Sequence, residues 1–314
     1  MPSFLKSKPK IEQLIESDPY GYALHDFKVR FSLVGPVSAG KSSLAAGLVV
    51  AANSMSSTMK NFYCRVLPKS SYILTDASNL RAGRFPARTD PYNPVTYEAG
   101  IIIGDRNNKK TMQIPISDTG GEVLDALALR TPTMEQHERI KNINRNVVKH
   151  IRESQGFILA LPAPEALIFR TGYAMQDVDS YVYTVLSDIM DFKLFSGTVI
   201  DGVAIWVTKS DEVLEEAANL GMNLLHPEGM MRFLDNGFPN TMMLLKPLRE
   251  AGKVQLFRSF FTIQRRDDGS LDLWEDGNKK IKILDDPSNY VRFKPEFAEL
   301  DSVKFIQWAA SFAK

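Results

Sequence analysis

A glycine-rich octapeptide carries residues whose types and spacing could bind a polyphosphate. Residues 35–42 read Gly-Pro-Val-Ser-Ala-Gly-Lys-Ser, which fits the pattern G-x-x-x-x-G-K-[ST]. The glycines allow a tight turn, and the amino terminus of the helix that follows supplies N–H donors and a positive dipole. Lys41 would place its charge between the outer phosphates, and the Ser42 hydroxyl would coordinate Mg²⁺. The expected phosphate-binding residues are Gly35, Ser38, Ala39, Gly40, Lys41, Ser42 and Ser43.

A second short motif, D-x-x-G, occupies residues 118–121 and follows an apolar segment of strand length. An aspartate at the end of a strand can hold Mg²⁺ through water, and the glycine N–H can contact a γ-phosphate. We therefore expect Asp118 and Gly121 to contact the nucleotide and its metal ion. Four residues match this pattern easily, so an ordinary turn is the alternative interpretation.

A third motif, Thr-Lys-Ser-Asp at residues 208–211, fits the guanine-binding pattern [NT]-K-x-D. The Asp211 carboxylate would accept hydrogen bonds from the N1 and N2 donors of guanine, which adenine does not offer. Thr208 would brace the loop, and the aliphatic stem of Lys209 would cover one face of the base. Two charge-assisted hydrogen bonds would favour guanine by roughly 3–6 kcal/mol. The alternative is a polar strand-to-helix turn in which Asp211 caps the helix.

The three motifs need strands that end at them and helices that begin after them, and the sequence supplies both. Apolar runs of strand length alternate with longer segments of helical period, which predicts an α/β fold with a mainly parallel sheet. Expected strands cover residues 28–34, 97–104, 111–117, 156–161, 202–207 and 254–262, the second and third forming a hairpin. Expected helices cover residues 42–53, 134–154, 174–193, 212–225, 239–251 and 301–313.

The remaining segments are expected to be peripheral. Residues 10–17 form a short amphipathic helix outside the core, and residues 54–95 form a long polar loop. A turn signal, Asp-Asp-Gly at 267–269, precedes a possible edge hairpin at 271–284. The polar stretch 264–300 is the best boundary candidate, but we expect an N-terminal extension at 1–27 and one domain at 28–314.

Composition limits the classes of partner and compartment. The chain of 314 residues has 38 Lys and Arg against 37 Asp and Glu, so its net charge of +1 gives no sign of bulk attraction to nucleic acid or anionic membranes. Its single cysteine, Cys64, excludes an intrachain disulfide, which fits a reducing cytoplasm. No apolar run of signal-peptide length begins the chain. We expect a cytoplasmic protein.

Together the motifs at 35–42, 118–121 and 208–211 resemble those of the Ras-like P-loop GTPases, over about residues 28–262. Within that family the chain is more similar to the double-GTPase proteins, a bacterial and archaeal set. Residues 85–91, Phe-Pro-Ala-Arg-Thr-Asp-Pro, look like the F-P-x-x-T segment of their first switch, and Glu122 directly follows the D-x-x-G glycine. An acidic residue, Asp301, leads into a Trp-bearing helix that runs to Phe312. The resemblance implies a three-layer sandwich with a mostly parallel sheet, one antiparallel edge hairpin and insertions.

The resemblance also implies a function and further site residues. It implies GTP hydrolysis to GDP and phosphate, with GTP or GDP and Mg²⁺ as ligands, in a switch or assembly factor. Thr89 would be the switch threonine that binds Mg²⁺ and the γ-phosphate, with Thr96 as the alternative. The implied metal ligands are Ser42, Thr89 and Asp118. A protein partner or a second copy of the chain would bind through the switch regions.

The chain departs from the family pattern at the residues that would govern catalysis. Glu122 stands where a water-orienting glutamine is usual, and Thr208 stands where asparagine is commoner. The positive charge needed during hydrolysis could come from Arg88, or from Arg84. The fifth motif is unclear, because Ser259 is more simply read as a strand residue. Two other functions stay open: a nucleotide-binding interaction protein with little hydrolysis, and an ATP-dependent P-loop kinase or ATPase.

Overall fold

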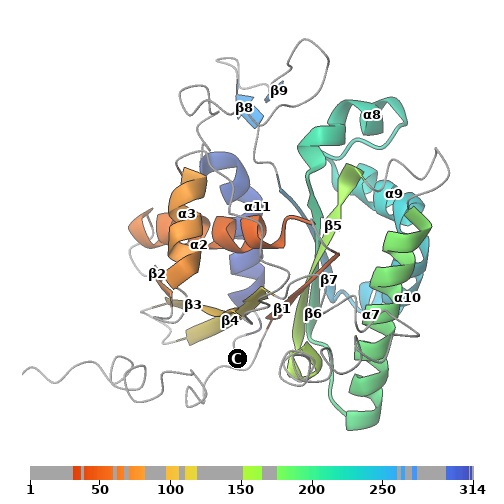
Figure 1. Cartoon of the computed structure of the whole chain (residues 1–314), viewed down its shortest axis with the longest axis horizontal. Helices are drawn as coiled ribbons and strands as arrows, with labels where there is room; N and C mark the ends of the chain where they lie inside the picture. The colour runs from red at the N-terminus through yellow and green to blue at the C-terminus, as the bar shows by residue number, and fades with distance from the viewer. Residues whose placement is uncertain are drawn as a thin grey trace, which may run out of the picture.

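The computed structural model describes residues 31–36, 39–58, 62–66, 71–81, 97–105, 110–118, 151–164, 175–259, 263–265, 271–273, 295–310 and 312. Its centre is a four-stranded, all-parallel sheet with the strand order β1-β5-β6-β7 (Figure 1). These strands are β1 (Phe31–Val34), β5 (Gly156–Pro162), β6 (Gly202–Thr208) and β7 (Val254–Arg258). The α/β class and the parallel sheet expected from the sequence are therefore confirmed.

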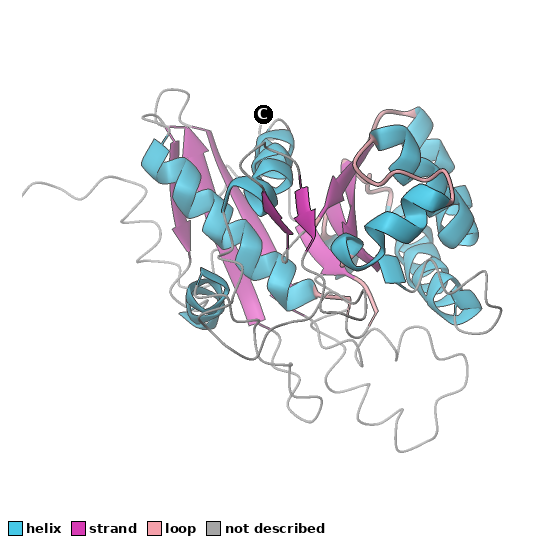
Figure 2. Cartoon of the chain, turned by 90° about the horizontal axis from the view of Figure 1, so that it is seen from above, coloured by secondary structure: helices cyan, strands magenta, loops and turns pink. Residues whose placement is uncertain are grey.

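Helices cover both faces of this sheet, as the unbroken apolar sequence of its inner strands requires. Every residue of β5 and of β6 is buried, which is typical of parallel strands packed on both sides. Successive side chains alternate between two cores: Phe157 and Leu159 belong to one, and Ile158 and Ala160 to the other. Figures 1 and 2 show the sheet between two groups of helices.

One face is covered by α2 (Lys41–Thr58) and α11 (Pro295–Ala310), with α3 (Ser71–Arg81) packed against α2. Aromatic rings fill the core under α11. Trp206 of β6 stacks on Phe257 of β7 with ring centroids 5.2 Å apart, and Phe305 of α11 meets Phe257 edge-on at 5.5 Å. The expected Trp-bearing closing helix is present, and it begins at Pro295 rather than 301.

The other face is covered by α7 (Met175–Ser196), α9 (Pro227–Gly237) and α10 (Pro239–Glu250). Asp179 of α7 fixes the start of α10 although the two helices are distant in sequence. Its carboxylate accepts hydrogen bonds from the backbone N–H groups of Asn240 and Thr241, each at 2.9 Å. Asp179 therefore replaces the missing side-chain cap of α10, whose own N-cap residue, Phe238, forms no side-chain cap.

Asp179→Ala is expected to lower the free energy of unfolding by about 1–2 kcal/mol, because the buried N–H of Thr241 and the partly buried N–H of Asn240 lose their acceptor. Urea titration followed by circular dichroism measures this. The matched control is Asp188→Ala on the same helix, which removes a half-exposed ion pair to Arg152 and is expected to cost less than about 1 kcal/mol. Equal costs for the two variants would contradict the capping role.

A second, antiparallel sheet contains β2 (Phe62–Val66), β3 (Tyr97–Asp105) and β4 (Lys110–Asp118) in the order β2-β3-β4. The hairpin expected at 97–117 is confirmed, with Tyr97 opposite Asp118 and Asp105 opposite Lys110. β4 lies beside β1, the strand that leads into the phosphate loop, with Cα atoms within 8 Å. A short third sheet pairs β8 (Ile263–Arg265) with β9 (Leu271–Leu273).

Several expected boundaries were wrong. The segment 54–95, interpreted as a loop, contains the end of α2, then β2 and α3. The mixed composition of α3 obscured its helical period. Ile73, Ala77 and Leu80 nevertheless lie on one face of the helix, and all three are buried. The helix expected at 212–225 is a 3₁₀ turn, Ser210–Val213, followed by α8 (Leu214–Asn219), which ends before Gly221 at φ +74°. The edge hairpin expected at 271–284 is instead a separate two-stranded sheet in which residues 271–273 pair with 263–265. The strand expected at 254–262 ends at Arg258.

Two further points complete the fold. α9 was not expected; it begins at a proline, which is favoured in the first turn of a helix. Residues 1–27, including the amphipathic segment 10–17, and residues 134–150 lie outside the described residues, and 151–153 are helical. Among the helices that the structure describes, none has the length and apolarity needed to cross a membrane.

Candidate functional site

The phosphate-loop motif connects the end of β1 to the start of α2, which is the context that the motif requires. The N–H of Ala39 donates to the carbonyl of Pro36 at 3.3 Å, and α2 begins at Lys41. Gly40 has φ +75°, a conformation that residues with a Cβ rarely adopt. The second glycine of the motif is therefore required by the backbone turn itself.

The first glycine of the motif is required by close packing. A Cβ on Gly35 would lie 2.5 Å from the carbonyl oxygen of Ala160 and 3.1 Å from its Cβ. Ala160 belongs to β5, the neighbour of β1, so only glycine lets the loop leave the sheet so close to the adjacent strand. The tight turn expected from the sequence thus explains Gly40, whereas Gly35 is explained by packing against the neighbouring strand, which the sequence did not indicate.

Lys41 reaches back over the loop that precedes it. Its ammonium group donates to the carbonyl oxygens of Gly35 at 2.7 Å and Pro36 at 2.6 Å, and the residue is 6% exposed. The first turn of α2 contains no acidic residue, so no carboxylate on that turn competes with an anion for its N–H groups. A buried cation and the amino end of a helix together suit a phosphate group. Ser42 and Ser43 are half-buried in the same turn.

The guanine motif begins where β6 ends. Lys209 has φ 53° and ψ 29°, and within the described ranges it is the one non-glycine residue with a positive φ. Such a conformation costs of order 1–3 kcal/mol and persists when the surroundings hold it, which is common at ligand sites. Asp211 lies inside the 3₁₀ turn; the N-cap positions there are Lys209 and, for α8, Val213. The helix-cap interpretation of Asp211 is therefore wrong.

The phosphate loop and the guanine motif lie against each other. A Cβ placed on Gly40 would be 3.9 Å from the Cβ of Thr208. Thr208 is 2% exposed, and its hydroxyl has no hydrogen-bond partner among the described residues. A buried hydroxyl without a partner costs about 1–3 kcal/mol, so a polar ligand at this point would relieve that cost. Two motifs that lie far apart in sequence are therefore close together in space, at the carboxyl ends of the parallel strands.

Ser259 joins the same edge, which the sequence did not predict. It follows β7 directly, and its N–H donates to the carbonyl of Val207 at 3.1 Å. Its carbonyl lies 3.0 Å from the hydroxyl of Ser210, the third residue of the guanine motif. The Ser259 hydroxyl, like that of Thr208, lacks a partner within the described chain. The sequence signal for this residue was a serine just after the strand that pairs with β6. We had interpreted that serine as part of the strand.

The structure leaves the expected switch and catalytic residues untested. Outside the described residues lie Ser38, Arg84, Arg88, Thr89, Thr96, Gly121 and Glu122. Of Asp118 the structure describes the backbone, which closes β4 opposite Tyr97. The described residues therefore bear on the loops at residues 35–42 and 208–211 rather than on a hydrolytic step.

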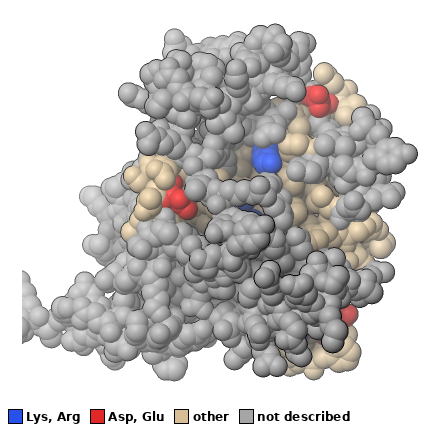
Figure 3. All heavy atoms as spheres, in the orientation of Figure 1, with Lys and Arg blue, Asp and Glu red and all other residues tan. Residues whose placement is uncertain are grey.

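Charge and donor chemistry at this edge fit a nucleotide with Mg²⁺. Lys and Arg atoms of the described residues are visible near the middle of the face in Figure 3. Over the described ranges no group of three or more His, Cys, Asp or Glu residues could hold a metal ion. A Mg²⁺ ion bound with a nucleotide needs no such group, because phosphate oxygens and water fill most of its coordination sites. The Ser42 hydroxyl, in the first turn of α2, could supply a protein ligand.

Comparison with known proteins adds no assignment. A scan against protein-family models gives no match, and a search of curated proteins gives no similar protein.

Proposed function

We propose that this chain is a Ras-like P-loop protein that binds GTP or GDP with Mg²⁺ and hydrolyses GTP to GDP and phosphate. The observation that carries the proposal is the proximity of Gly40 to Thr208, whose Cβ lies 3.9 Å from the position that a Cβ on Gly40 would take. It places a phosphate-type loop and a guanine-type motif within one ligand's reach, at the carboxyl edge of a parallel sheet. This is the edge where such folds bind ligands. The finer assignment, a three-layer sandwich of the P-loop class, is supported by helices on both faces.

Each described residue of the two motifs would have a role in binding the nucleotide. The N–H groups of Gly40, Lys41 and Ser42 would face the β-phosphate, and the Lys41 ammonium would exchange its carbonyl partners for phosphate oxygens. Thr208 would brace the base loop against the phosphate loop through its free hydroxyl. Lys209 would lie along the base, and Asp211 would accept from the N1 and N2 donors of guanine. When bound, Mg²⁺ would neutralise charge on the phosphates.

Hydrolysis would depend on residues supplied by the two switches. Thr89, or Thr96, would close over the γ-phosphate, while Asp118 and Gly121 would sense it from the other side. Glu122 would orient water or accept its proton, and Arg88 would stabilise the developing charge. A cycle of this kind suits a cytoplasmic switch or assembly factor that meets a protein partner or a second copy through these segments.

A multiple-turnover phosphate-release assay, with GTP and ATP in parallel, tests the activity. We expect release from GTP, and much slower release from ATP. Equal release from both nucleotides would favour an ATPase or kinase. Tight GTP binding without release would favour a nucleotide-binding interaction protein. Absence of binding to either nucleotide would refute the proposal.

Arg88→Ala is expected to slow single-turnover GTP hydrolysis at least about tenfold, because an arginine at the transferring phosphate is commonly worth about 10³–10⁵ in rate. GTP affinity should stay within about threefold, since the charge matters mostly in the transition state. Rapid-quench measurement with enzyme in excess gives the rate. Arg84→Ala is the comparison, because Pro86 separates Arg84 from Thr89. If neither variant slows the reaction, the positive charge comes from a partner.

A further inference from the structure

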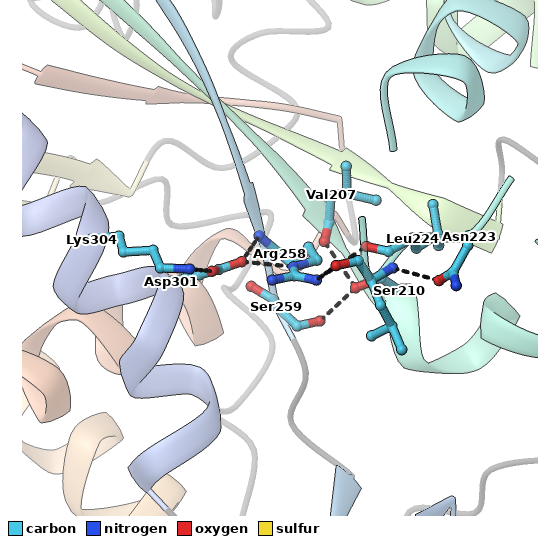
Figure 4. Close-up of polar contacts among 9 residues, drawn as sticks. Val207, Ser210, Asn223, Leu224, Arg258, Ser259, Asp301 and Lys304 are labelled. Atoms are coloured by element: carbon cyan, nitrogen blue, oxygen red, sulfur yellow. Dashed lines mark hydrogen bonds and ion pairs between the residues drawn. The ribbon is translucent and has the colours of Figure 1, made fainter. Parts of the chain in front are cut away.

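Arg258, the last residue of β7, connects the C-terminal helix to the segment that follows α8. Its Nε donates to Oδ2 of Asp301 in α11 at 2.9 Å, and its backbone N–H donates to the same oxygen at 2.8 Å. Its Nη1 donates to the carbonyl oxygen of Leu225 at 2.7 Å and to that of Leu224 at 3.3 Å. One guanidinium therefore joins α11 to residues 224–225 (Figure 4).

The residue after Arg258 holds the other end of the same segment. The carbonyl of Ser259 accepts from the hydroxyl of Ser210, which also lies 3.2 Å from the carbonyl of Val207. Ser210 is fully buried and stands between Lys209 and Asp211. The segment 208–225, which contains the guanine motif and α8, is thus attached at both ends: one end to Arg258, the last residue of β7, and the other to Ser259, which follows it.

Burial makes the pair between Arg258 and Asp301 stronger than a surface contact. The two side chains are 20% and 7% exposed, and Asp301 accepts two hydrogen bonds from Arg258 on one oxygen. Its other oxygen lies 3.5 Å from the ammonium of Lys304, which is 59% exposed. A charge-assisted contact that is largely withdrawn from water loses little to screening, whereas the Lys304 contact loses much.

The strained backbone of Lys209 needs such support. Its left-handed conformation lies immediately before Ser210, so the hydrogen bond from Ser210 to Ser259 holds the backbone between Lys209 and Asp211. If β7 shifted, this conformation would lose the contact that holds it. The end of β7 is itself held by Asp301, through the backbone N–H of Arg258.

We propose that Arg258 and Asp301 are positioning residues for base recognition, and that α11 is through them a supporting element of the guanine site without touching the nucleotide. The inference rests on the proposed function, because it assigns a role within the base-reading half of that site. The proposal distinguishes two loops. The base loop, which carries the guanine motif at residues 208–211, would depend on this pair, whereas the phosphate loop is built by β1, β5 and α2.

The first test compares a ligand that has a base with one that lacks it. Calorimetry with GDP and with pyrophosphate, both with Mg²⁺, is run on wild type, Asp301→Asn and Arg258→Lys. Asp301→Asn is expected to weaken GDP by about tenfold, the size expected when one charge-assisted interaction is lost. Pyrophosphate affinity is expected to stay within about twofold, because neither residue of the pair belongs to β1, β5 or α2, the elements that build the phosphate loop. Arg258→Lys should act in the same direction, since an ammonium lacks the planar fork that reaches both partners.

The second test needs no ligand. Hydrogen exchange of the free protein should be faster at amides 208–213 in both variants and unchanged at 39–44. Lys304→Ala is the matched control, because it removes the exposed contact to Asp301 and leaves Arg258 in place; it should change neither measurement. Equal loss of both ligands, or unchanged exchange at 208–213, would overturn the inference. A wild-type protein that binds ADP as tightly as GDP would instead refute guanine recognition, while the exchange result still decides whether the pair positions the loop.

Discussion

Lys41→Ala is expected to weaken GTP binding by more than about tenfold, since a charge-assisted contact to phosphate is worth about 1.5–3 kcal/mol and 1.4 kcal/mol is one decade of affinity. The ammonium group already points into the loop, where it bonds the carbonyls of Gly35 and Pro36. In the complex it would move to the phosphates. Calorimetry with GTP and Mg²⁺ measures the change, and thermal unfolding shows whether the fold is kept.

Lys253→Ala is the matched control for this variant. Lys253 also donates a hydrogen bond to a backbone carbonyl, that of Ile200 at 2.7 Å. It lies just before β7, at the amino ends of the parallel strands and so at the end of the sheet opposite the two motifs. Lys41→Ala should cost more stability than Lys253→Ala, because Lys41 is buried and bonds two carbonyls, whereas the partly exposed Lys253 bonds that of Ile200. Only Lys41→Ala should change nucleotide affinity. Unchanged affinity for GTP would disprove the phosphate-loop assignment.

The parts of this molecule that could be predicted from sequence are those that local patterns determine. The strands β5 and β6 are continuous apolar runs, and their ends were placed within one residue. The first motif predicted a strand–loop–helix unit because its glycines and the helix start are neighbours in sequence. Such features need no knowledge of distant residues.

The parts that could not be predicted depend on contacts between distant residues. Nothing near Asp179 in sequence shows that it caps α10, since its partners lie 61 and 62 residues away. The same holds for Arg258 and Asp301, which are 43 residues apart. α3 was hidden for another reason: its buried stripe, Ile73, Ala77 and Leu80, is narrow, and Leu74 beside it is exposed, so the apolar residues gave no clear helical period.

The candidate site shows the same difference between features set by local sequence and features set by distant contacts. The residue types of the phosphate loop and the guanine motif were evident from sequence, but their mutual contact through Gly40 and Thr208 was not. The position of Ser259 beside Ser210 depends on the pairing of β6 with β7, which periodicity does not specify. A candidate chemistry could therefore be proposed from local residues, whereas the arrangement of those residues in space required the fold.

Asp211→Asn is expected to reverse the preference of the site from guanine to xanthine. A carboxylate accepts from the N1 and N2 donors of guanine, and loss of two such bonds costs roughly 3–6 kcal/mol, or about 10²–10⁴ in affinity. Asparagine offers an N–H donor that suits the O2 carbonyl of xanthine. Competition of GDP and xanthosine diphosphate against a fluorescent guanine nucleotide, with the wild-type titration alongside, measures both changes.

The substitution isolates base recognition from stability. Asp211 occupies neither N-cap position of the turn or of α8, and asparagine is close to aspartate in size, so unfolding should be nearly unchanged. Asp201→Asn is the matched control, because Asp201 precedes β6, at the end of the strand opposite the motif. The preference for GDP should persist in this variant. Loss of GDP binding without a gain for xanthosine diphosphate would leave Asp211 a determinant of binding but not of base identity. If the wild-type protein binds ATP as tightly as GTP, Asp211 does not read guanine, whatever the variant does.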